Sequence, residues 1–396
     1  MKKWFSLGEI SKYHIISLFI PFFYLATTYV QRDLIIENEG ENNNPYNKNY
    51  QLPYFIIIFF SKTFAGFLYL ISKYIINKNL LSSKLLSLRS KRIYHLNINS
   101  KKKLKIILLI LVISFFEVFY NLEHIKTLKI KSLIEMKIGF IFFIPIISYF
   151  ILKTKYYRHH FVSLIIVFIG FIFIILSLII SNENDKNNEF DVGQQIKHFL
   201  YSIPFSLSIV LICYLLRYYF INPFAFLFFD GIFCILFSFI FILLEYINNS
   251  DIIINNFKNF FIVFKTWKIF FLFLCILLFS FIYYISTVIT LYLFNPTLFV
   301  MTDILFPILR WIIDTLVILF SKDKSEKINK TQSIFEFIGY IFLIVACALF
   351  NEIIICNFWN LNYNTYQEIK KRGIEDVKEN NDNTLISVNE SIISNN

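Results

Sequence analysis

The sequence predicts an all-α polytopic membrane protein, with ten transmembrane helices arranged as two inverted five-helix repeats. Of its 396 residues, 57% are hydrophobic and only 16% are charged, a composition outside the range of soluble domains. Apolar runs of about 18 residues or more recur along the chain, and each is long enough to cross the hydrocarbon core of a bilayer as a helix. Segments of the first half also resemble segments of the second half.

The ten spans follow from the apolar runs in order. Backbone polar groups inside a bilayer must be paired within the segment, so each run is expected to form a helix. The predicted spans are 12–30, 53–77, 104–122, 132–152, 161–181, 196–221, 223–247, 268–294, 296–320 and 332–356. They divide the chain into a first repeat with the N-terminus (1–181), a second repeat (196–356) and a polar tail (357–396) that is expected to be disordered.

The formal net charge of +11 raises the alternative of a nucleic-acid partner. Most Lys and Arg residues, however, lie in connectors between apolar runs, where membrane orientation and anionic lipid account for them. The connector 73–105 holds ten Lys and Arg residues and is expected to face the cytoplasm, whereas 31–52 and 182–197 are acidic and rich in Asn. The sequence therefore predicts no nucleic-acid binding and places both termini in the cytoplasm.

The repeat is recognised first by a proline motif. FFIPIISYFI (142–151) aligns with ILFPILRWII (304–313), which places Pro145 on Pro307. Similar composition alone is the alternative explanation, because many Phe- and Ile-rich helices resemble one another. The shared proline, followed in both copies by Ile and an aromatic residue, favours duplication.

A glycine motif follows the proline motif in the same order in both halves. VFIGFIFIIL (167–176) aligns with EFIGYIFLIV (336–345), which places Gly170 on Gly339. If each half holds five spans, an odd number, the second half enters the membrane with opposite polarity. Inverted repeats of this kind build many secondary transporters, whose halves rock about a site near the bilayer midplane.

Charged residues inside the spans are the candidate substrate-binding or gating positions, because a charge near the bilayer centre costs ~2.5–3.5 kcal/mol on insertion scales. With one neighbouring serine, the candidates are Lys62, Glu117, Ser132, Glu135, Asp230, Asp303, Arg310 and Asp314. On uninterrupted helices, the polar residues of 296–320 share one stripe and those of 132–152 share one face. We expect both faces to line one central cavity, with contributions from 53–77, 104–122 and 223–247.

Several of these residues have a simpler alternative role. Arg310 and Asp314 are four positions apart and can neutralise each other, Glu135 can reach the membrane surface, and Glu117 can be a helix-packing partner. Asp303 is the strongest candidate, because a carboxylate in a half-dry cavity can carry a coupling proton. The mixed signs leave open the charge of the solute, proton coupling against exchange, and whether two copies form a homodimer.

Small and helix-bending residues in the spans are predicted to act as hinges or packing points. Pro145 and Pro307 each remove one backbone hydrogen bond and permit bending. Gly139, Gly170 and Gly339 allow neighbouring helices to approach closely.

Short motifs in several spans are similar to those of a known group. The clearest are Ser132, Glu135, Met136 and Gly139 (S-x-x-Q-M-x-x-G), Asn222, Pro223, Asp230 and Gly231 (D-P…E-G), and Thr297, Asp303 and Trp311 (T…D…W). With the ten-span plan, they resemble the drug/metabolite transporter superfamily, and within it the nucleotide-sugar-transporter-like branch, solute carrier family 35, F-type members. Glu135 replaces the usual Gln, and Pro307 and Arg310 interrupt the ninth span.

The resemblance implies a secondary transporter that moves a small polar solute, a nucleotide sugar or related metabolite, by alternating access. It implies an endomembrane of the Golgi, ER or lysosome/vacuole type. A non-transporting membrane scaffold or chaperone is the alternative. The sequence predicts no enzyme, metal or cofactor: the six His residues lie at span ends or in loops, and no nucleotide-binding motif is present. Five cysteines in or near apolar runs are expected to be core residues rather than a disulfide framework.

Overall fold

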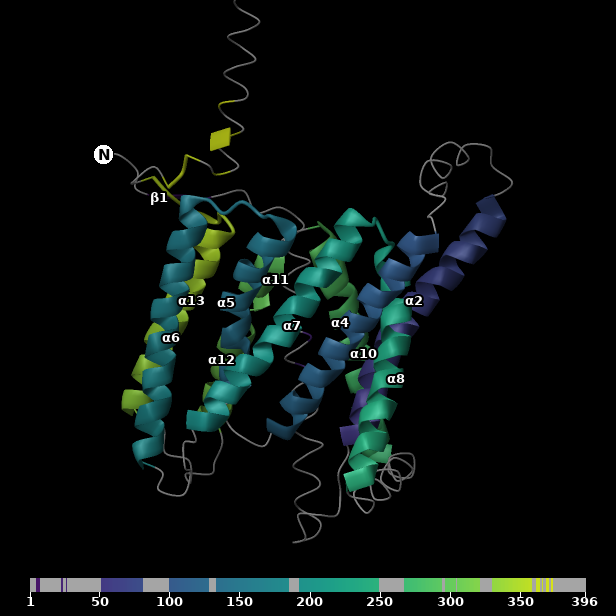
Figure 1. The fold of residues 1–396 in the computed structure, drawn as a ribbon. Helices are drawn as coiled ribbons and strands as arrows, with labels where there is room; N and C mark the ends of the chain where they lie inside the picture. The colour runs from purple at the N-terminus through teal and green to yellow at the C-terminus, as the bar shows by residue number, and fades with distance from the viewer. Residues whose placement is uncertain are drawn as a thin grey trace, which may run out of the picture. The chain divides into compact units, whose positions relative to one another are not determined.

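The computed structural model describes most of the apolar runs and part of the rest of the chain. The described residues are 5–7, 23, 26, 51–80, 100–127, 133–184, 192–248, 267–293, 296–303, 305–320, 330–357, 361–363, 365, 368–369 and 372. They are almost entirely helical (Figure 1), with one short two-stranded sheet. The helical class predicted from composition is therefore confirmed.

Eight helices in the described part of the chain are long and apolar enough to cross a membrane. Large apolar side chains such as Phe150, Ile165 and Trp267 are exposed on these helices, which suits lipid rather than water. The predicted first span, 12–30, lies outside the described residues except for Phe23 and Ala26. The predicted fourth span is present as a helix, but its apolar part, Gly139–Leu152, is shorter than the other eight.

The chain forms two compact units, each containing helices from both halves of the sequence. The first unit comprises residues 1–11, 155–187 and 328–396. Its helices are α6 (Arg158–Asn184) and α13 (Lys330–Phe350), which pack against each other. Strand β1 (Phe5–Leu7) pairs antiparallel with β2 (Ile354–Cys356), with Phe5 opposite Cys356.

Small residues set the close contact between α6 and α13. A Cβ built on Gly170 would lie 3.0 Å from the carbonyl oxygen of Gly339, and one built on Gly339 would lie 2.9 Å from that of Gly170. The Ser163 hydroxyl donates to the carbonyl of Ala346 at 2.6 Å. Ser163 contacts Ala346, and Gly170, later in α6, contacts Gly339, earlier in α13. The two helices are therefore antiparallel.

The second unit, residues 12–154 and 188–327, holds the remaining helices. These are α2 (Gln51–Leu80), α4 (Ser100–Thr127), α5 (Leu133–Leu152), α7 (Val192–Tyr218), α8 (Pro223–Asn248), α10 (Trp267–Leu293), α11 (Pro296–Asp303) and α12 (Leu305–Phe320). Helix α2 packs against α8 and α10, α4 against α7 and α8, and α5 against α7 and α11. Several helices of this unit therefore surround a common interior.

Helices α2 and α8 approach most closely at two glycines. A Cβ on Gly66 would lie 2.5 Å from the backbone nitrogen of Phe228, and a Cβ on Gly231 would lie 2.7 Å from that of Thr63. Thr63 precedes Gly66 by three residues, as Phe228 precedes Gly231. The contact is therefore reciprocal, with the backbones touching where only glycine fits.

Local sequence explains where α8 begins. Asn222 accepts a hydrogen bond from the backbone N–H of Phe224 at 2.9 Å, as an N-cap does. Pro223 takes the first helical position, where its missing N–H costs nothing. The Asn222 side chain also donates to the hydroxyl of Tyr69 at 3.1 Å, which fixes the start of α8 against α2.

The two aligned prolines both lie within described helices. Pro145 lies inside α5, where it removes one backbone hydrogen bond, yet the helix continues to Leu152. The ninth predicted span is covered by α11 and α12, and residue 304 between them is outside the described residues. Pro307 falls within the bounds of α12, and the interruption expected there stays a prediction.

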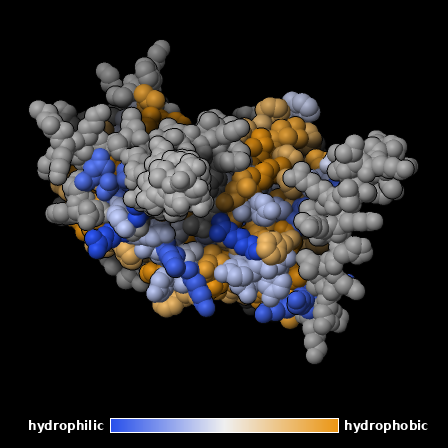
Figure 2. Space-filling view, turned by 90° about the horizontal axis from the view of Figure 1, so that it is seen from above, coloured by the Kyte–Doolittle hydropathy of each residue, from blue (hydrophilic) through white to orange (hydrophobic). Residues whose placement is uncertain are grey.

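Figure 2 looks down on the end of the helices at which residues 153–157 lie. Hydrophilic residues, in blue, stand there beside apolar ones, in orange. Lys153, Lys155 and Arg158 are exposed in this part of the chain. The combination is expected where helices leave the hydrocarbon and enter the headgroup region.

Candidate functional site

Lys62 is the centre of a buried charged cluster in the second unit. It lies in α2 with 1% of its surface exposed, and its ammonium contacts the Glu117 carboxylate of α4 and the Asp230 carboxylate of α8. Glu117 and Asp230 are 6% and 0% exposed. Three predicted site residues from three helices therefore form one cluster.

The packing of the helices explains why Asp230 reaches Lys62. Gly231 allows α8 to touch the backbone of α2 at Thr63, the residue that follows Lys62. Asp230, which precedes Gly231, is thereby held beside the lysine. Its other oxygen, Oδ1, accepts a hydrogen bond from Ser114 of α4 at 2.6 Å. Oδ1 thus has a hydrogen bond, whereas Oδ2 has the ion pair with Lys62 but no hydrogen bond within the described protein.

Cys234 completes the cluster one turn after Asp230. Its Sγ lies 3.6 Å from Glu117 Oε2 and 3.8 Å from Asp230 Oδ1. A thiol and two carboxylates this close together can hold a metal ion such as Zn²⁺. Both carboxylates already contact the Lys62 ammonium, however, so a metal ion would have to displace it.

The cluster opens on a cavity inside the second unit. Side chains from α2, α4, α5, α7, α8, α10 and α11 line it. Its charged residues are Lys62, Glu117 and Asp303, the last of which is 7% exposed. Its uncharged polar residues are Tyr120, Asn121, Ser280, Tyr283, Tyr284 and Thr287.

Aromatic rings form much of the remaining wall. Tyr120, Phe140 and Phe205, from α4, α5 and α7, contact one another with centroid separations of 5.4, 4.5 and 4.7 Å. Tyr284 of α10 lies under the Lys62 ammonium, 5.1 Å from the ring centroid. The cavity is therefore charged around Lys62 and aromatic elsewhere.

Thr287 is the polar residue of the wall whose hydrogen bonding is incomplete. It is 6% exposed, and its Oγ1 has no hydrogen-bond partner within the described protein. A buried hydroxyl without a partner costs free energy unless a bound molecule or water satisfies it. Thr287 is thus available to a ligand in the cavity.

Four of the predicted site residues lie at this cavity or in the cluster beside it. The others lie away from it or are not described. Lys62, Glu117 and Asp230 form the cluster, and Asp303 lies on the cavity wall. Arg310 is half-buried in α12 and is not among the residues that line the cavity.

The remaining predicted residues stay predictions. Ser132 lies outside the described residues, and Glu135 and Asp314 lie in helices whose side chains at these positions are not described. The stripe expected for Asp303, Arg310 and Asp314 stays a prediction, because residue 304, between α11 and α12, and the side chain of Asp314 are not described. Gly139 is buried in α5.

Sequence reasoning missed Ser114, Cys234 and Thr287, as well as the large share of the wall that comes from α7 and α10. Helical spacing could have found two of these residues. Ser114 lies three residues before Glu117 and Cys234 lies four after Asp230, so each shares a helix face with a charged residue. Thr287 has no charged neighbour in its span that would have indicated it.

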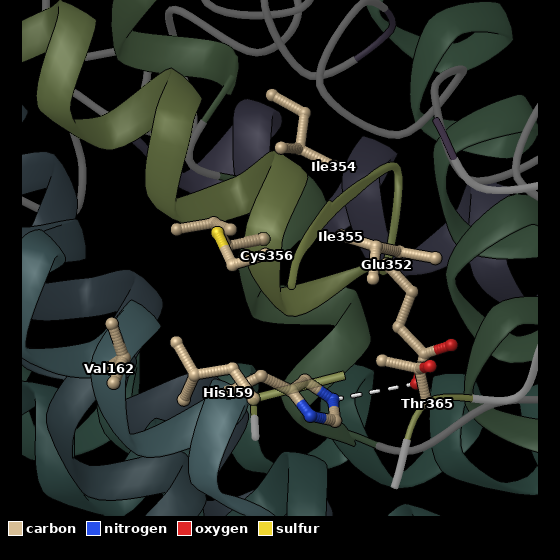
Figure 3. Close-up of a pocket in the computed structure, with 9 residues that line it drawn as sticks. His159, Val162, Glu352, Ile354, Ile355, Cys356 and Thr365 are labelled. Atoms are coloured by element: carbon tan, nitrogen blue, oxygen red, sulfur yellow. Dashed lines mark ion pairs between the residues drawn. The ribbon is translucent and has the colours of Figure 1, made fainter. Parts of the chain in front are cut away.

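A second polar group lies in the first unit, where α6 begins and α13 ends (Figure 3). His159 Nε2 lies 3.5 Å from Glu352 Oε1, beside a small pocket that also includes Cys356, Leu361 and Thr365. Leu361 and Thr365 belong to the predicted tail and are buried here. Desolvation raises the pKa of the Cys356 thiol.

Comparison with known proteins adds no family assignment. No protein-family model matches the chain, and no curated protein matches it. The chain is a multi-pass helical membrane protein by its apolar helices, and its function has to be inferred from the cavity.

Proposed function

We propose that the chain is a secondary transporter that moves a small polar solute across a membrane by alternating access. The observation that carries this proposal is the Lys62–Glu117–Asp230 cluster beside a cavity within the helices of the second unit. Charged groups at membrane depth are costly and mark substrate or ion pathways more often than structural contacts. The proposal agrees with the resemblance to the drug/metabolite transporters and their F-type branch.

The reciprocal glycine contacts support an inverted repeat of two five-helix halves. Under such a repeat, α2 and α8 are symmetry mates, and so are α6 and α13. Gly170 and Gly339, aligned by sequence, touch each other's carbonyl oxygens. Gly66 touches Phe228 just as Gly231 touches Thr63. Such reciprocal pairing is what a two-fold axis in the membrane plane produces.

Contacts between other helices also agree with the repeat. The repeat relates α2 to α8 and α10 to α4, so a contact of α2 with α10 should be matched by one of α8 with α4. Both contacts are present. The repeat also relates the predicted first span to α7. The Phe23 and Phe279 rings lie 6.2 Å apart, and the corresponding pair of helices brings Phe119 and Tyr201 to 5.8 Å. These matches support ten spans, including the predicted spans 12–30 and 132–152.

The orientation, the compartment and the class of solute are proposed from the sequence. The positive connector 73–105 favours cytoplasmic termini, and the resemblance favours an endomembrane of the Golgi, ER or lysosome/vacuole type. Among small polar solutes, the resemblance implies nucleotide sugars or related metabolites.

Flux through reconstituted liposomes tests the proposal. Candidate solutes would include UDP-glucose, lysine and benzyltrimethylammonium, with transport read as uptake of radiolabel. We expect saturable uptake of at least one solute, lost in Glu117→Gln and kept in Glu336→Gln, the same change on α13 outside this cavity. Well-folded protein that moves none of a broad solute panel would favour the scaffold alternative.

A further inference from the structure

We infer that the cavity binds a solute that carries a positive charge, a protonated or quaternary amine attached to an apolar or aromatic body. The inference rests on the proposed function only in calling this ligand a transported solute. It concerns the same site and names the chemical class that fits it.

The first argument is the charge balance of the cluster. Lys62 supplies one positive charge, whereas Glu117 and Asp230 supply two negative charges, and all three are buried. When both carboxylates are ionised, the cluster therefore carries one excess negative charge in a medium that solvates it poorly. A cation from outside, either a proton or the solute, is needed to neutralise it.

The position of Glu117 decides where this cation sits. Asp230 lies behind Lys62, where the ammonium and the Ser114 hydroxyl engage its two oxygens, and it does not line the cavity. Glu117 does line the cavity, and Asp303 adds a further carboxyl group to the same wall. The excess negative charge is thus accessible to a ligand through Glu117.

The aromatic wall suits the same class of ligand. Tyr284 already faces the Lys62 ammonium, and Tyr120, Tyr283 and Phe205 provide further rings around the cavity. Ring faces attract alkylammonium groups and exclude water from apolar bodies. The unpartnered Thr287 hydroxyl can meet one polar group of the ligand.

The described lining is unfavourable to phosphate. Lys62 is the single cationic side chain among the residues that line the cavity, and two carboxylates already contact it. Among these lining residues a diphosphate would meet the carboxyl groups of Glu117 and Asp303. The charge of the cavity therefore favours an amine over a nucleotide sugar.

Equilibrium binding to the purified full chain tests the inference without requiring transport. The probes are benzyltrimethylammonium, its uncharged isostere neopentylbenzene, and UDP-glucose, in nanodiscs at a single pH. We expect saturable binding of the ammonium, weakened about tenfold or more for the isostere and in Glu117→Gln. Glu336→Gln should bind like the wild type. The comparison of the ammonium with its isostere uses the wild-type chain, so it remains decisive if Glu117→Gln does not fold.

The outcomes separate this inference from the proposed function. Binding of the ammonium without flux would support the cationic site and contradict transport. Flux and binding of UDP-glucose, with no saturable ammonium binding, would support transport and overturn the cationic site. Affinity for the ammonium that equals affinity for the isostere would overturn it too.

Discussion

Gly170 of α6 and Gly339 of α13 face each other so closely that each glycine's missing Cβ would lie within 3.0 Å of the other's carbonyl oxygen. These are the residues that the sequence repeat aligns. These two carbonyl oxygens are backbone atoms, which cannot rotate away as a long side chain can, and side-chain atoms of Phe342, Leu343 and Ile174 lie equally close. The contact therefore disfavours a Cβ at both positions.

Alanine at either position should destabilise the first unit. Inserting a methyl group into a packed interface costs about 1–3 kcal/mol, so Gly170→Ala and Gly339→Ala should each lower the midpoint of thermal unfolding in detergent. Ile172→Ala, at an exposed position of α6, should have little effect. Unfolding midpoints unchanged by both glycine substitutions would contradict the close backbone contact.

Removing the lysine of the charged cluster should cost more than removing one of its carboxylates. Lys62→Met leaves Glu117 and Asp230 buried without a counter-charge, a loss of about 3–5 kcal/mol for a broken buried ion pair. Asp230→Asn leaves Lys62 paired one to one with Glu117 and should cost less. Unfolding free energies of the two variants and of the double variant measure this difference. A larger cost for Asp230→Asn would contradict the excess negative charge.

The Ser114 hydroxyl should stabilise the second unit through Asp230. Ser114→Ala leaves Asp230 Oδ1 without that donor, which costs about 1–3 kcal/mol for a buried charged acceptor. Ser238→Ala is the matched control, because this buried hydroxyl bonds only to the carbonyl of Cys234 one turn earlier in its own helix. We expect the control to lose less unfolding free energy. Equal losses would mean that the bond to Asp230 contributes nothing.

The thiol of Cys356 should react slowly with iodoacetamide in the folded protein. Desolvation raises its pKa, so less thiolate is present at pH 7.5, and the rate should increase as the pH is raised. Ser6→Pro disrupts the pairing of β1 with β2, in which Ser6 lies opposite Ile355, and should speed the reaction several-fold. Mass spectrometry of the Cys356 peptide reads the rate. A rate equal to that of the unfolded chain would contradict the burial.

The sequence was sufficient to predict the helical class and the members of the charged cluster, because each charge inside an apolar run is costly and easily noticed. It could not pair them, since Lys62 and Glu117 lie 55 positions apart on helices whose contact depends on tertiary packing. The contributions of α7 and α10 were missed because neutral residues such as Thr287 and Phe205 do not stand out from an apolar run.

Accessibility of Thr287→Cys from both sides of the membrane tests alternating access most directly and requires no knowledge of the solute. A membrane-impermeant methanethiosulfonate would be applied to vesicles of either orientation, with the wild-type chain and the lipid-facing Ile172→Cys as controls for background labelling. The account predicts labelling of position 287 from each side. Labelling from one side only, or from neither, would contradict a cavity that opens alternately to both.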